Sequence, residues 1–111
     1  MNYLVLIYGQ DPPPVNAWQA VRELTLLKDE LAGSGELVSS EGLAVPADGK
    51  VVRIREGVQV VTDGPFGEAK EQLAGYFMID VADDDRAQQL AGRVSAIVGD
   101  RVELRGAVFP D

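Results

Sequence analysis

The sequence predicts a single α+β domain spanning residues 1–111, and three observations support this fold class. The apolar residues change from the continuous or alternating patterns typical of strands to the 3.6-residue period typical of helices, and they do so twice. Turns rich in glycine and proline separate these segments. One of the turns, Glu56-Gly57, joins two β-branched runs and is typical of a two-residue hairpin loop. A chain of 111 residues has the length of one domain.

The first part of the chain predicts a strand, a helix and a second strand. Tyr3–Tyr8 is apolar at consecutive positions, so this strand is expected to be covered on both faces. Asn16 is expected to cap the helix in a capping box with Gln19, and Gly33–Gly35 to end it. The buried stripe of this helix is predicted to be Ala20, Leu24, Leu27 and Leu31. Glu36–Leu43 is then a short strand of mixed polarity.

The middle of the chain predicts a β-hairpin over residues 50–63, "KVVRIREGVQVVTD". Pairing across its two-residue loop gives each face a distinct set of side chains. One face carries an apolar row, Val52, Ile54 and Val61. The other face carries Arg53, Arg55, Val58, Val60 and Thr62.

The last part of the chain predicts a strand, a helix and a closing strand. Leu73–Val81 is apolar on both faces up to Asp80. Asp83 is expected to cap the following helix, and the acidic run Asp83–Asp85 is explained better by the helix dipole than by a cation site. The stripe of this helix is predicted to be Ala87, Leu90, Ala91, Val94 and Val98. The closing strand is Arg101–Val108.

This order of elements describes a ferredoxin-like sandwich, strand-helix-strand, hairpin, strand-helix-strand. Two helices can cover only one face of the sheet, although Tyr3–Tyr8 and Leu73–Val81 are apolar on both. The second face therefore needs a partner, and a second copy of the chain is the simplest one. We expect a homodimer as the minimum unit.

Composition excludes several classes of function. The net charge of −8 disfavours nucleic acid and anionic membrane surfaces as partners. There are no cysteines and no histidines, which removes disulfides, thiolate nucleophiles, zinc–sulfur sites and the usual general base. We expect no metal and no cofactor. The first ten residues lack a basic leader and a long apolar run, so a cytoplasmic protein is expected.

One motif is specific enough to indicate a family. Residues 61–81, "VTDGPFGEAKEQLAGYFMIDV", closely resemble the signature of the YCII-related proteins, in the branch named after its DGPF tetrapeptide. The resemblance covers essentially the whole chain and includes "YLVLIYG", "SSEGLAVP", "VVRIREG" and "VELRGAV". It implies a dimeric α/β barrel, in which two ferredoxin-like sheets pack face to face around a central cavity.

The resemblance implies less about function. Most members of the DGPF branch have no established activity, and many are thought to be encoded near extracytoplasmic-function sigma factors. More distant members act as lyases or dehydrochlorinases on small cyclic compounds, and a His-Asp pair is implicated in them; without histidine, this chain cannot carry that pair. Our leading hypothesis is a small dimer that binds a small organic molecule in the barrel cavity, with lyase-like or hydrolytic acid/base chemistry left open. The alternative is a regulatory or protein-interaction module of a sigma-factor system, without catalysis.

The candidate site centres on Asp63, which follows a core-facing strand row and needs a partner or a function. Arg53, Arg55 and Lys70 are its candidate partners. Asp63 is our candidate catalytic residue, acting as a base through water, and the alternative is an ion pair that shapes the turn. The candidate ligand-binding residues are Arg53, Gly64, Pro65, Phe66, Glu68, Lys70 and Arg105. For Gly64, Pro65 and Phe66, turn geometry and packing are the competing explanation.

Overall fold

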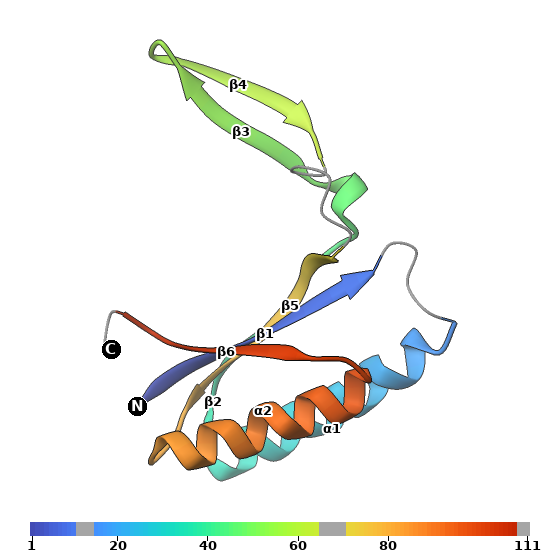
Figure 1. Cartoon of the computed structure of the whole chain (residues 1–111), viewed down its shortest axis with the longest axis vertical. Coiled ribbons are helices and arrows are strands. Elements are labelled where there is room, and N and C mark those ends of the chain that lie inside the picture. The colour runs from blue at the N-terminus through green and yellow to red at the C-terminus, as the bar shows by residue number, and fades with distance from the viewer. Residues whose placement is uncertain (11–14, 65–70, 109–111) are drawn as a thin grey trace.

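The computed structural model of the chain describes residues 1–10, 15–64 and 71–108. Figure 1 shows its arrangement, a sheet with both helices on one side and a hairpin that projects from one end. The elements follow one another as β1 (Asn2–Gln10), α1 (Ala17–Ser34), β2 (Leu37–Gly42), a 3₁₀ turn (Pro46–Asp48), β3 (Lys50–Arg55), β4 (Val58–Asp63), β5 (Glu71–Asp80), α2 (Asp84–Val98) and β6 (Val102–Gly106).

Four strands form the main sheet, in the order β2-β5-β1-β6, and each strand runs antiparallel to its neighbours. The two central strands, β1 and β5, are the longest, and the two halves of the chain interleave because β5 lies between β1 and β2. The α+β class is confirmed, and this strand order is consistent with a ferredoxin-like fold.

The hydrophobic core lies between the sheet and the two helices. Val5 and Ile7 of β1 and Phe77 and Ile79 of β5 point towards the helices and are buried. Of the stripe predicted for α2, Ala87, Leu90, Ala91 and Val94 are buried. Of the stripe predicted for α1, only Leu27 and Leu31 are buried, while Ala20 and Leu24 are half-buried. The first half of α1 therefore packs less closely than its periodicity indicates.

The two helices begin differently. The side chain of Asp83 accepts a hydrogen bond from the backbone N–H of Arg86 at 2.8 Å, so the predicted cap of α2 is confirmed. Asn16 does precede α1, but its side chain makes no capping bond, and the predicted capping box with Gln19 is wrong. Asn16 has φ −98° and ψ 18° rather than the extended backbone of a capping residue, and the backbone N–H of Gln19 donates to its carbonyl oxygen instead.

The face of the sheet turned away from the helices is the outer face. It carries the residues that alternate with the buried ones, and the register pairs Leu4 with Met78 and Leu6 with Tyr76. With Tyr8, these side chains are half-buried, and no helix covers them (Figure 1). The prediction that β1 and β5 are apolar on both faces is confirmed.

The hairpin of β3 and β4 forms a separate two-stranded sheet. Its loop residues Glu56 and Gly57 both have positive φ, 50° and 79°, as a type I′ turn requires. The register pairs Val52 with Val61, which places the predicted side chains on the predicted faces. Within the described residues, no helix is long and apolar enough to cross a membrane.

Candidate functional site

Three polar side chains meet on the outer face of the sheet. The hydroxyl of Tyr8, on β1, donates a hydrogen bond to Oε1 of Glu103, on β6, at 3.0 Å. The guanidinium of Arg105 donates to the other oxygen of Glu103 at 3.1 Å. Glu103 and Arg105 share this face because they lie two residues apart on β6, paired with Leu6 and Leu4. We call Tyr8, Glu103 and Arg105 the polar triad.

The hydrogen bonds set the charges of the triad. Two hydrogen bonds hold the pKa of the Glu103 carboxyl below its ordinary value. The one from Arg105 has the larger effect, and the one from Tyr8 the smaller. The hydrogen bond to Glu103, followed by desolvation, raises the pKa of the Tyr8 phenol. At neutral pH the triad therefore consists of a carboxylate, a protonated phenol and a guanidinium. Arg105 is 66% exposed, so its remaining N–H groups are accessible to an anionic or carbonyl-bearing ligand.

Asp63, the residue at the centre of the predicted site, lies at the base of the hairpin. It forms an ion pair with Lys50, directly opposite on β3, and its side chain is 80% exposed. The predicted partners did not include Lys50. Counting back from the two-residue loop pairs residue 55 with 58 and residue 50 with 63. The hairpin register therefore could have predicted Lys50 as the partner of Asp63. Arg53 lies on the other face of the hairpin and is exposed.

Gly64 has a packing reason to be glycine. Its backbone N–H donates to the carbonyl oxygen of Gly49 at 2.9 Å. A Cβ atom at Gly64 would lie 2.6 Å from the carbonyl oxygen of Pro46, closer than real Cβ contacts allow. This close approach supports the turn explanation for Gly64. Four further candidates, Pro65, Phe66, Glu68 and Lys70, lie outside the described residues and stay predictions.

Within one chain, the structure does not bring those candidate residues that it describes into a single site. Asp63 and Arg53 lie on the projecting hairpin, whereas Arg105 lies on the main sheet (Figure 1). Tyr8 and Glu103 belong with Arg105, although the sequence did not single out Glu103. Glu103 could have been found from the sequence, because it alternates with Leu104 just as Arg105 does.

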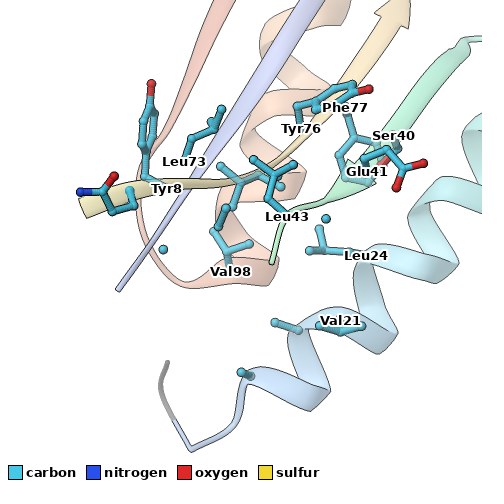
Figure 2. A pocket seen from close by; sticks show the side chains of 18 of the residues that line it. Tyr8, Val21, Leu24, Ser40, Glu41, Leu43, Leu73, Tyr76, Phe77 and Val98 are labelled. Carbon is cyan, nitrogen blue, oxygen red and sulfur yellow. The ribbon is translucent and has the colours of Figure 1, made fainter. Parts of the chain in front are cut away.

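A groove of about 760 Å³ opens at the end of the sheet beside the first half of α1. Figure 2 shows Val21 and Leu24 of α1 on one side of it, with Leu43 and Val98 across from them. We call this feature the α1 groove. It lies where the helix is less closely packed, since the fully buried residues of α1, Leu27 and Leu31, are both in its second half. Helix periodicity did not predict it.

The described part of the chain contains no cluster of three or more carboxylate, histidine or cysteine side chains that could hold a metal ion. The carboxylates at the start of α2 serve the helix instead, since Asp83 is its cap and Asp84 and Asp85 lie in its first turn.

Comparisons with known proteins identify the family of the chain. The pattern of the YCII-related domain matches residues 1–105. An uncharacterised protein of Rhizobium meliloti (strain 1021) is 33% identical over 101 residues, which cover 86% of this chain and 81% of that protein. The matched residues include all the helices and strands except Gly106, the last residue of β6. The chain belongs to the YCII-related domain family.

Proposed function

We propose that the protein is a homodimer that binds a small anionic or carbonyl-bearing organic molecule between two outer sheet faces. The observation that carries this proposal is the polar triad, which places an accessible guanidinium and an ionised carboxylate within an otherwise apolar, uncovered surface. Ligand sites typically combine apolar walls with a few such convergent polar groups.

The uncovered outer face supports the second copy. Leu4, Leu6, Tyr76 and Met78 together form an apolar surface at the centre of the sheet. Surfaces of this kind on single domains mark interaction sites. A two-fold axis would place the same surface on both sides of the interface, which is the arrangement that closes into a dimer. The result is the dimeric α/β barrel, with one triad from each copy at its wall.

The "DGPF" tetrapeptide at residues 63–66 supports placing the chain in the DGPF branch. In this proposal Asp63 contributes to ligand binding from the hairpin. The neighbouring candidates of the motif, which lie outside the described residues, keep the roles that the sequence predicts for them. The chemistry available to the triad is acid/base chemistry, because Tyr8 holds a proton and Glu103 carries a charge beside it.

The test combines a ligand screen with one substitution. Wild-type protein is screened by thermal shift against small carboxylates, keto acids and neutral compounds of matched size. We expect stabilisation by members of the charged or carbonyl-bearing classes. Arg105→Gln should weaken their binding at least tenfold while leaving the far-UV circular dichroism spectrum unchanged. Arg101→Gln, an arginine just before the same strand, is the matched control and should bind as wild type does.

Two results would contradict the proposal. One is a solution mass near 11.9 kDa at micromolar concentration, which is that of a single chain. The other is a bound ligand whose affinity does not change in Arg105→Gln.

A further inference from the structure

The β3–β4 hairpin, residues 50–63, leaves a row of apolar side chains in water, and we call this segment the arm. Val52 is 57% exposed, Ile54 67% and Val61 50%, and the register places all three on one face. A two-stranded hairpin is marginally stable by itself and needs another surface against its apolar face. Among the described residues of a single chain, nothing therefore covers the apolar face of the arm.

The base of the arm is closed by specific contacts. Lys50 and Asp63 form an ion pair across it, and the N–H of Gly64 is bonded to the carbonyl oxygen of Gly49. The close approach of Gly64 to Pro46 holds the 3₁₀ turn against the same point. These contacts give the arm a defined direction away from its own sheet (Figure 1). A covering surface is therefore more readily supplied by another molecule than by the same chain.

The α1 groove is an apolar surface that is likewise uncovered by the described part of the chain. Val21 is 51% exposed, Leu43 47% and Leu73 41%, and all three line the groove. Figure 2 shows Val21 and Leu43 on either side of the open space between α1 and the ends of the strands. The groove is large enough for several apolar side chains at once, since its volume is about 760 Å³.

The charges of the arm and of the rest of the chain are complementary. Residues 50–63 contain three basic and two acidic side chains, a net charge of +1, whereas the remaining residues contain seven basic and sixteen acidic ones, a net charge of −9. Arg53 and Arg55 lie on the face opposite the apolar row, and neither has an ion-pair partner among the described residues. A basic arm and an acidic body attract one another between copies.

We propose that the arm of one copy lies in the α1 groove of a second copy, and that the second copy returns the same contact. Val52, Ile54 and Val61 cover the apolar lining of the groove, and Arg53 and Arg55 remain on the solvent side of the arm. The exchange is reciprocal, so it closes into a dimer rather than a filament. This inference rests on the homodimer of the proposed function, but it does not depend on the proposed ligand.

Cysteine cross-linking tests this placement, because the chain contains no cysteine of its own. One chain carries Ile54→Cys on the apolar face of the arm, and a second chain with a different tag carries Val21→Cys in the groove. The two are co-expressed, purified through both tags and treated with a short bis-maleimide. We expect a covalent product containing one chain of each kind.

Matched controls come from the same two elements. Val58→Cys lies on the other face of the arm and is 62% exposed, close to the 67% of Ile54. Leu26→Cys lies on α1 outside the groove and is 63% exposed, more than Val21. Replacing either member of the pair by its control should lower the cross-linked yield at least tenfold. Equal yields in all pairs would overturn the proposal.

A second measurement uses no cross-linker. Ile54→Thr keeps a β-branched residue in the strand but weakens the apolar row, and it should raise the dimer dissociation constant at least tenfold in sedimentation experiments. Val58→Thr should change it little. An intrachain product in a chain with both Ile54→Cys and Val21→Cys, without interchain product, would show that the arm folds onto its own groove.

The outcomes separate this inference from the proposed function. A dimer without preferential cross-linking overturns the placement of the arm and leaves the ligand site standing. Suppose instead that the two chains cross-link as expected but that Arg105→Gln binds the ligand as tightly as wild type. The placement of the arm then stands, and the ligand site is overturned. A monomeric wild-type protein overturns both.

Discussion

Asp63 at the end of β4 forms an ion pair with Lys50 at the start of β3, directly across the base of the hairpin. The carboxylate that the sequence identified as a candidate catalytic residue therefore has a charged partner within its own hairpin. Both side chains are more than half exposed, at 80% and 61%. Ion pairs this exposed contribute little to stability, so the pair does not by itself explain why the position is an aspartate.

The first prediction follows from this exposure. Asp63→Asn should lower the free energy of unfolding by less than about 1 kcal/mol, because it removes one solvated ion pair and keeps a side-chain oxygen. Binding of a ligand found by the screen should nevertheless weaken at least tenfold. Lys50→Gln is the control, since it breaks the same ion pair without removing the carboxylate. If Asp63→Asn protein binds the ligand as tightly as wild type, Asp63 has no role in binding and serves only the structure of the turn.

The second prediction concerns Gly64. Gly64→Ala should destabilise the protein by about 1–3 kcal/mol, because the new methyl group would meet the backbone oxygen of Pro46 and force the turn to shift. Urea unfolding measures the change. Gly42→Ala is the matched control, since a Cβ atom at Gly42 would meet no other atom within 4 Å. Equal effects of the two substitutions would contradict the steric explanation.

The third prediction concerns the ion pair that joins the start of β2 to α2. Arg86 donates from Nε and from a terminal nitrogen to the two oxygens of Glu36, both at 2.9 Å. Arg86, assisted by the hydroxyl of Ser34, lowers the pKa of Glu36 from 4.5 to about 2. Because the folded-state pKa is the lower one, the stabilisation is complete above about pH 4.5 and is lost as the pH falls towards 2.

Glu36→Gln should therefore lower the free energy of unfolding by at most about 3 kcal/mol at pH 7, and the difference from wild type should shrink as the pH falls below 4.5. Denaturant unfolding at several pH values measures it. Glu30→Gln is the control, because its ion pair with Arg93 joins the two helices at the surface, with side chains 54% and 43% exposed. It should cost less stability than Glu36→Gln does, because solvent screens the exposed pair. A difference between Glu36→Gln and wild type that is independent of pH would contradict the assignment.

The sequence determined most of the secondary structure and the two faces of each strand. β1, β5 and the hairpin were predicted because side-chain alternation and the Glu56-Gly57 loop are local properties that the register then preserves. The cap at Asp83 was predicted for the same reason, since a carboxylate needs only the next three residues to cap a helix. The family motif was likewise readable from the chain alone, and the domain match over residues 1–105 confirms the family.

Only the tertiary structure decided which of these elements meet. The periodicity of α1 is uniform, but Leu27 and Leu31 are buried while Leu24 is only half-buried against the core, because the core encloses the second half of the helix more completely. Tyr8 and Glu103 are 95 residues apart in sequence and share a hydrogen bond because β1 and β6 are neighbours in the sheet. The alternation of apolar and polar side chains along β3 and β4 likewise does not predict that the arm projects away from the sheet. Periodicity reports which face of an element is apolar, whereas the surface that covers this face depends on contacts between distant segments and, for the outer face and the arm, on the second molecule that we propose.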